Sequence, residues 1–241
     1  MIIYTVDMIE KYIGQKVKDP YDRTIGTLTS VYSDVDGVVN AVEILLGDSV
    51  FKTFEARMLT IKNGELVLLP EWKFKSMKII EKLERGRRRA RALEDLYSKG
   101  EIPKHTYDEF KAKLTRDLER LKGEAKEVKE LIRKRIHELE DQIVQAEKAL
   151  TALKVSYIAG EIGERGYKPA VDILRQGRDR NLEEKSDAKR VLELIQRLEA
   201  AGVELEWEQE ERALEKVEEG ESIVGEPLYV EVVQDTAKSE A

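Results

Sequence analysis

The densest group of side chains that could do chemistry is a run of five arginines within seven residues. Guanidinium groups stay charged at physiological pH and carry several N–H donors, so such a cluster suits the phosphates of nucleic acid or lipid. The same residues also suit a solvated helix face on which they pair with acidic neighbours. Both interpretations stay open for Arg85, Arg87, Arg88, Arg89 and Arg91.

Patterns typical of catalytic or metal sites are not found. The sequence has no cysteine, which removes thiolate chemistry and disulfides and fits a cytoplasmic protein. Its two histidines, His105 and His137, are not spaced with carboxylates as metal ligands usually are. There is no phosphate-binding loop and no nucleophile beside a base. The sequence therefore predicts a protein that is not an enzyme and needs no metal or cofactor.

An apolar segment stands near the C-terminus between acidic and polar flanks. It is rich in β-branched residues, and a single strand is not stable alone in water. The segment could be a disordered remnant or could pack on its own chain, but it is best suited to adding a strand to a partner's sheet. The predicted partner-binding residues are Pro227, Leu228, Tyr229, Val230, Val232 and Val233.

The N-terminus is also apolar, and this pattern is compatible with two roles. It could form a short amphipathic helix on a membrane surface, although it lacks a rich basic face, or it could cover the β domain that follows. The residues that would contact a membrane are Ile2, Ile3, Val6 and Ile9. No apolar run is long enough to span a bilayer, and no signal peptide is recognisable.

Residues 1–73 alternate as short β-strands separated by turns. Strands are expected to end at Val17 and to cover 24–33, 38–46, 50–54, 58–61 and 66–69, with turns at 19–23 and 34–37. Asn63-Gly64 is the strongest hairpin signal, and Pro70 ends the last strand. So many short strands in so few residues predict a small, strongly curved β-barrel.

Residues 74–218 instead follow a helical period. Apolar residues recur at alternating steps of three and four, which predicts a long coiled coil with one helix spanning about residues 104–159 and a further helix from about Tyr167 to Val217. Polar Arg178, Asn181 and Lys185 fall on this apolar seam, where they are either partly solvated or serve to set the register.

The same short sequence motif, which we call a phrase, occurs at both ends of the long helix. Tyr97-Ser-Lys-Gly-Glu-Ile and Tyr157-Ile-Ala-Gly-Glu-Ile are each followed by a second tyrosine, Tyr107 or Tyr167, at the same offset. Because glycine ends helices readily, the phrases predict duplicated helix reversals near residue 100 and at 160–166. Whether the helices fold back within one chain or pair between chains stays open.

Charge is distributed unevenly along the chain, whose net charge is −7. Basic residues outnumber acidic ones between 77 and 140, whereas acidic residues dominate from 199 onward. Residues 219–241 are expected to be a flexible tail that carries the apolar segment at 226–234. The two regions could attract different partners or each other between molecules.

This order of parts resembles the archaeal cell division protein family CdvA. The residues that carry the resemblance are KYIGQKVKDP at 11–20, LTSVYS at 28–33, PEWK at 70–73, GEIP at 100–103 and KVSYIAGEI at 154–162. The resemblance covers nearly the whole chain. It implies an α+β multidomain protein with an N-terminal PRC-barrel, a central α-helical coiled coil and a flexible tail.

The resemblance also implies a function. Members of this family are expected to assemble into filaments at the division site, on the cytoplasmic face of the membrane, and to recruit the ESCRT-III-like protein CdvB. The terminal segment would dock on the winged-helix part of CdvB, while self-association would build homodimers and filaments. The alternative is an architectural DNA-binding protein that uses the basic helix at 85–91.

Overall fold

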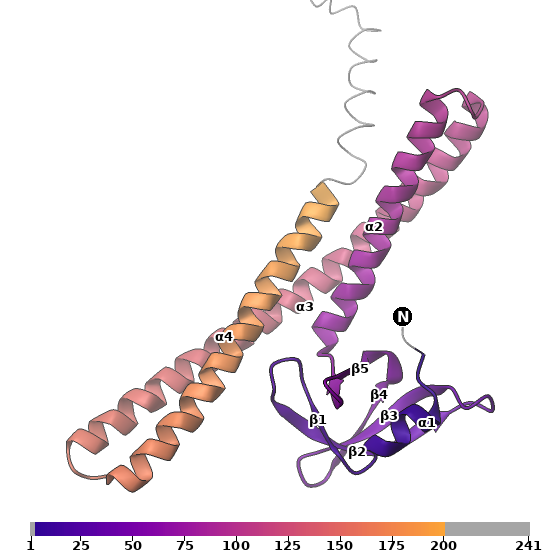
Figure 1. Ribbon diagram of the computed structural model, residues 1–241. Helices are drawn as coiled ribbons and strands as arrows, with labels where there is room; N and C mark the ends of the chain where they lie inside the picture. The colour runs from indigo at the N-terminus through magenta and orange to yellow at the C-terminus, as the bar shows by residue number, and fades with distance from the viewer. Residues whose placement is uncertain (1–2, 201–241) are drawn as a thin grey trace, which may run out of the picture. The chain divides into compact units, whose positions relative to one another are not determined.

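The N-terminal part of the chain folds into a small curved sheet. The computed structural model describes residues 3–200, and over that range the sheet has six strands in the order β4-β3-β2-β1-β6-β5 (Figure 1). Strands β1 and β6 pair in parallel, and the other neighbours are antiparallel. The bounds are β1 Lys16–Lys18, β2 Thr24–Ser33, β3 Val39–Leu46, β4 Val50–Glu55, β5 Leu59–Lys62 and β6 Glu65–Leu68.

The predicted α+β class is confirmed, but the sheet is not closed into a barrel. Strands β4 and β5 stand at its two ends, and within residues 3–200 no ladder joins them. The reason lies at Pro70, which caps helix α2 directly after β6, so that the chain leaves the sheet before another strand can bridge the gap. A cavity lies at this place instead.

The strand positions agree with the alternation of the sequence to within one or two residues. Asn63 and Gly64 have φ angles of 53° and 80°, and such a pair of positive φ angles is typical of the two-residue hairpin that was predicted. The inner face of the sheet buries Val17, Leu28, Val42 and Ile44 completely. A short helix, α1 (Val6–Ile9), and a 3-10 turn, η1 (Glu10–Tyr12), complete this core, and a second 3-10 turn, η2 (Ala56–Met58), links β4 to β5.

Three helices follow: α2 (Glu71–Ser98), α3 (Lys104–Ile158) and α4 (Glu164–Ala200). Helix α2 begins three residues before the predicted start, because the amide of Phe74 already donates to the carbonyl of Pro70 at 3.0 Å. Helix α4 likewise begins before Tyr167, since the amide of Tyr167 bonds to Gly163. The predicted continuation of this helix to 217 lies outside the described residues.

Both predicted reversals fold back within one chain, and they are built alike. Tyr97 stacks on Tyr107 with ring centroids 4.2 Å apart, and Tyr157 stacks on Tyr167 at 4.1 Å. Gly100 and Gly160 take positive φ angles of 70° and 78°, which close each helix with the hydrogen bonds of a Schellman turn. The tyrosine stacks therefore hold both hairpins closed at their tips.

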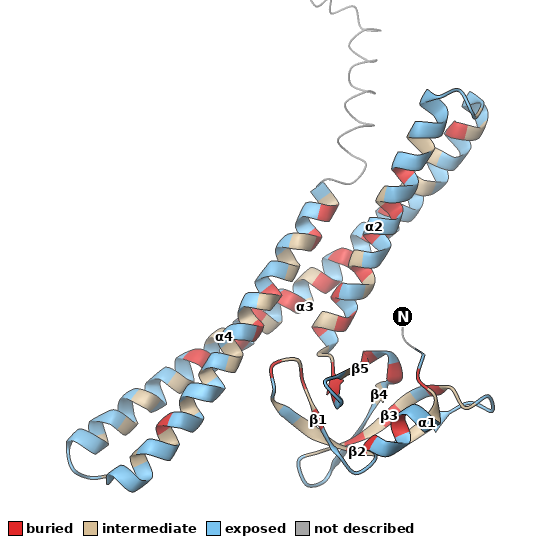
Figure 2. Ribbon diagram, viewed as in Figure 1, coloured by how far each residue is buried: buried red, intermediate tan, exposed pale blue. Residues whose placement is uncertain are grey.

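Helix α3 is shared by the two hairpins. Helix α2 packs on its first half, where Gly86 lies so close to Leu118 that an added Cβ would stand 2.8 Å from that side chain. Helix α4 packs on its second half, where Lys185 pairs with Glu140 at 3.0 Å. The buried residues of α3 are concentrated in its middle (Figure 2), and α2 and α4 also contact each other.

Candidate functional site

The turn between β1 and β2 reaches toward the helices. Asp19 is buried, and its Oδ1 accepts the backbone N–H groups of Tyr21 and Arg23 at 2.9 and 2.8 Å. Its other oxygen accepts the Arg23 Nε–H at 2.6 Å. This predicted turn is therefore a rigid support that aims the Arg23 guanidinium at helix α4.

At the centre of the site is Glu184, a carboxylate on α4 whose side chain is 0% exposed. Arg23 donates to Oε2 from the β domain, and Trp72 donates its indole N–H to Oε1 at 2.9 Å from the start of α2. Arg135 of α3 donates to both oxygens, at 2.8 and 2.9 Å. We call these four residues the junction cluster, because together they connect the sheet with all three helices.

Further contacts with the β domain and α2 lie one turn on either side of Glu184 along α4. Asp187 accepts the hydroxyl of Tyr21 at 2.8 Å and an ammonium N–H of Lys73 at 2.5 Å. Arg23 also donates to the side-chain oxygen of Asn181 at 3.1 Å. The polar residue Asn181, which the helical period places on the seam, thus meets the β domain.

Protonation of these carboxyls is controlled by two opposing effects. Burial raises the pKa of Glu184, but hydrogen bonds from Arg135, Arg23 and Trp72 outweigh it and leave the pKa below its ordinary value. The pKa of Asp187 is lowered in the same way, by Lys73 and Tyr21 acting against burial. Burial, and then the Asp187 carboxylate, raises the pKa of the Tyr21 hydroxyl. Glu184 and Asp187 are therefore both ionised near neutral pH.

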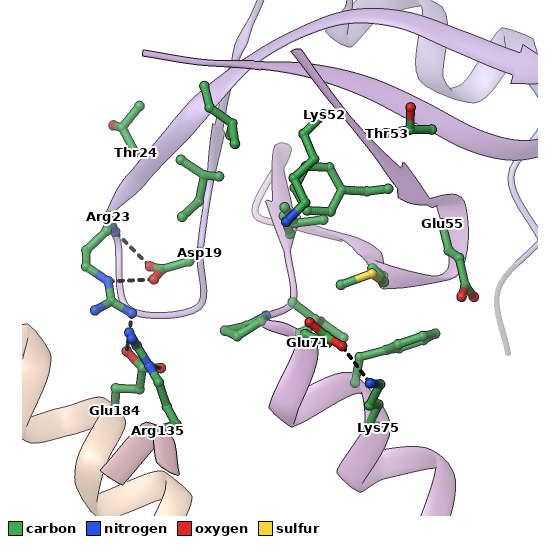
Figure 3. A pocket seen from close by; sticks show the side chains of 18 of the residues that line it. Asp19, Arg23, Thr24, Lys52, Thr53, Glu55, Glu71, Lys75, Arg135 and Glu184 are labelled. Atoms are coloured by element: carbon green, nitrogen blue, oxygen red, sulfur yellow. Dashed lines mark hydrogen bonds and ion pairs between the residues drawn. The ribbon is translucent and has the colours of Figure 1, made fainter. Parts of the chain in front are cut away.

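A cavity of about 650 Å³ lies between the open sheet and the first turns of α2 (Figure 3). Arg23, Arg135 and Glu184 form one wall, and Lys52 and Glu55 of β4 lie on the other side. The remaining lining is mostly apolar and includes Ile25, Leu46, Phe54, Met58, Leu68, Leu69 and Phe74. The cavity marks the place where the sheet fails to close.

Electrostatically, the junction cluster is suited to holding parts of the chain together. Every buried side-chain nitrogen and oxygen of the described chain has a hydrogen-bond partner. Within residues 3–200 no group of His, Asp and Glu side chains is arranged to hold a metal ion. Ion pairs so completely satisfied fix the geometry of a junction more than they raise its stability.

The sequence alone did not point to the junction cluster. Glu184 lies beside the apolar seam of α4, between Asn181 and Ala188, and the sequence pattern predicts that it is one of many solvated glutamates. Its partners are far away in sequence, so no local spacing reveals them. The only signal was that Asp19, Pro20 and Trp72 fell within the residues that carried the family resemblance.

The arginine run lies on α2, where Arg85, Arg88, Arg89 and Arg91 are exposed and Arg87 is half-buried. Arg85 and Arg88 pair with acidic side chains one turn earlier, Glu81 at 2.6 Å and Glu84 at 3.8 Å. The ion pairs of Arg85 and Arg88 agree with a solvated helix face, and the exposure of the arginines also leaves them accessible to phosphates. Phosphate binding by the run stays a prediction.

The structure corrects part of the predicted membrane contact. Ile9 is 0% exposed and packs in the core of the sheet, and Val6 lies half-buried against the same core. Because α1 packs its apolar side chains over the sheet, Ile9 cannot reach a bilayer, whereas Val6 keeps part of its surface exposed. Ile3 is 69% exposed, whereas Ile2 lies outside the described residues.

The terminal partner-binding residues, Pro227 to Val233, also lie outside the described residues, as does the predicted tail at 219–241. Their role stays a prediction. Among the helices that the structure describes, none is both long enough and apolar enough to cross a membrane.

Comparison with known proteins decides the family. A profile of the CdvA-like coiled-coil domain matches residues 71–218, which is more than half of the chain. The chain belongs to the CdvA family. It is 39% identical over 200 residues to cell division protein A of Sulfolobus acidocaldarius, and the match covers 83% of this chain and 84% of that protein. No solved structure matches the chain.

Membership in the CdvA family supports a role in cell division. The matched coiled-coil domain includes all of α2, α3 and the described part of α4, and so contains three members of the junction cluster: Trp72, Arg135 and Glu184. The fourth, Arg23, comes from the β domain.

Proposed function

We propose that this CdvA-family protein is a cell-division scaffold without catalytic activity. It would assemble into filaments at the division site, at the cytoplasmic face of the membrane, and would recruit an ESCRT-III-like partner, CdvB, through residues 227–233. The observation that carries the proposal is the junction cluster on a helical spacer. A buried ion network that joins the sheet to three helices gives each subunit a defined geometry, which ordered assembly needs.

Recruitment would follow from repetition. A segment that adds one strand to a partner binds weakly, because its ordering costs conformational entropy. An array of such segments along a filament raises the local concentration of each, so that many weak contacts become strong together. The acidic residues that precede the partner-binding segment, from position 199 onward, would tether this segment to the helices of the filament.

Electron microscopy of the purified protein, with and without acidic lipid vesicles, tests assembly and membrane attachment. The proposal expects filaments, and a uniformly monomeric protein at micromolar concentration would refute the scaffold. Removing Glu226–Ala241 should leave assembly intact and abolish binding to CdvB. Loss of assembly on that truncation would refute the separation of the two roles.

Point variants test the binding segment itself. Tyr229→Asp and Val232→Asp place a charge within the strand that would dock, so calorimetry should show CdvB affinity reduced by about tenfold or more. Thr236→Asp adds the same charge outside the segment and is the matched control. Equal affinities for all three variants would assign the contact to another surface.

DNA binding by the arginine run is the second candidate, and the exposure of Arg85, Arg88, Arg89 and Arg91 favours it. Binding carried by phosphate contacts falls steeply with salt concentration. Replacing the five arginines by serine should remove that binding and its salt dependence. DNA affinity that survives the replacement would exclude the run as the site.

A further inference from the structure

Strand β4 is an exposed edge of the open sheet. Its only partner over residues 3–200 is β3, and the cavity of Figure 3 borders its residues Lys52 to Glu55. Two adjacent large apolar side chains of this strand, Val50 and Phe51, are 58% and 62% exposed. Such an edge offers unpaired N–H and C=O groups to any strand that can lie beside it.

The opposite edge of the sheet is better protected. In β5, Leu59 is buried and the two residues after it are half-buried. The hydroxyl of Tyr4 donates to the carbonyl of Leu59 at 3.1 Å and so occupies part of that edge. Natural sheets usually protect their edges in such ways, so the exposure of β4 alone points to a partner.

The β3–β4 register shows which way the side chains of β4 point. Lys52 and Phe54 lie opposite Ile44 and Val42, and they face the inner side of the sheet. Their neighbour Thr53 faces the outer side, where its hydroxyl donates to Glu43 at 2.7 Å. Phe51 shares the outer side with Thr53, because side chains alternate along a strand. Glu55, the last residue of β4, instead pairs with Lys78 of α2 at 3.4 Å.

A strand that pairs with its own copy has few registers to choose from. In an antiparallel pair, directly opposite residues point to the same face of the sheet. The two-fold axis must therefore lie midway between one residue and the same residue of the second copy, so that this residue pairs with itself. An axis at Lys52 would place two lysines directly opposite each other, which is unfavourable. An axis at Phe51 or Phe54 would leave fewer residues of β4 paired.

An axis at Thr53 avoids both problems. Phe51 to Glu55 of both strands would then pair, with Thr53 opposite Thr53 of the second copy. Lys52 would face Phe54 of the second copy, a cation–π arrangement that it already makes within its own chain, where its ammonium is 5.2 Å from that ring. Glu55 would face Phe51, so no like charges meet.

We propose that β4 pairs antiparallel with β4 of a second copy of this chain, about a two-fold axis at Thr53. The pairing rests on the self-assembly in the proposed function and names one of its contacts. It continues the sheet of one subunit into the next and covers Phe51 and its symmetry mate.

The absence of native cysteines allows a direct test in the full chain. Residues that face themselves across an antiparallel ladder have Cα atoms about 4.5–5.5 Å apart, within reach of a disulfide. Thr53→Cys should therefore give a disulfide-linked dimer under mild oxidation. Phe51→Cys is the matched control in the same strand, because its two copies would lie roughly 14 Å apart at about 3.4 Å per residue.

A second pair of positions tests the register. Glu55→Cys alone should not crosslink, for the same reason as Phe51→Cys. Both cysteines together should crosslink, because positions 51 and 55 of the two strands face each other. The expected yield of dimer from Thr53→Cys and from the double variant exceeds that of either single control by at least about tenfold, the advantage of held over diffusing thiols.

Thr53→Lys should abolish the crosslink of the double variant, since two lysines would face each other at the axis. In its own chain the new side chain lies beside Glu43, so the subunit should keep its melting temperature.

Crosslinking of all single variants alike would indicate random collision and overturn the pairing, as would the absence of a crosslink in Thr53→Cys. A crosslink that forms only after residues 226–241 are removed would assign the edge to that segment and also overturn it. Filaments without the crosslink refute this contact alone, whereas a protein without filaments refutes the proposed function.

Discussion

Replacing Glu184 by alanine should loosen the junction between the β domain and the helices. The variant leaves the guanidinium groups of Arg23 and Arg135 and the indole N–H of Trp72 without their shared acceptor. Breaking a fully buried ion pair from one side costs about 3–5 kcal/mol. Here the arginine side chains are 24% and 26% exposed, and each keeps a second carboxylate, so we expect about 2–4 kcal/mol.

Fluorescence of Trp72 reports this junction directly, because its indole is 3% exposed and bonds to the carboxylate. The chain has one other tryptophan, Trp207, and Trp207→Phe leaves a single reporter. In urea titrations of that background, Glu184→Ala should lower the midpoint by about 1–2 M, if the slope is roughly 2 kcal/mol per M.

The neighbouring residue supplies the control. Glu183 is exposed on the same helix, and Glu183→Ala should change the stability by at most about 0.5 kcal/mol. A double-mutant cycle between Arg23→Ala and Glu184→Ala should give a coupling energy of about 1–3 kcal/mol. If Glu184→Ala shifts the midpoint no more than Glu183→Ala does, the junction cluster does not hold the two parts together.

The remaining predictions concern pH and packing. The pKa of Glu184 is lowered in the folded protein, so the stability that its carboxylate contributes is present above the ordinary carboxyl pKa of 4.5 and is lost as pH falls through the lower folded value. The emission of Trp72 should shift to the red over that pH range. This step should be absent in Glu184→Gln. Gly26→Ala should destabilise the sheet by about 3 kcal/mol or more in thermal melts, since its Cβ would lie 2.2 Å from a carbonyl oxygen of β3, whereas Gly123→Ala, in open space on α3, should stabilise by about 0.5–1 kcal/mol. Tyr157→Ala should open the tip of the second hairpin, and faster amide hydrogen exchange there, with unchanged exchange at the first tip, would check it.

Most elements of the fold could be predicted from local pattern. Alternation and turn residues placed the strands to within two residues, because the sheet buries one face. The repeated tyrosine–glycine phrase located both reversals, since the stacked rings and the positive φ of the glycine need only residues close in sequence. Seven-residue periodicity located α3 to within one residue of its C-terminal end.

Long-range features could not be predicted in this way. Nothing near Glu184 distinguishes it from its exposed neighbours; its burial depends on an arginine 161 positions earlier in the chain. Closure of the sheet was predicted from the number of strands, but closure depends on where the chain goes after β6. Ile9 has the same apolar character whether it faces a bilayer or a core, so only its packing over the sheet decided the question.

The two reversals have a consequence for the polarity of the chain. Each one inverts the direction of travel, so α2 and α4 run the same way and only α3 runs back (Figure 1). An even number of such reversals leaves the last helix parallel to α2, whereas a third copy of the tyrosine–glycine unit would make the last helix antiparallel to α2. Natural or engineered length variants should therefore gain or lose these units in twos, if the last described helix is to keep the direction of α2.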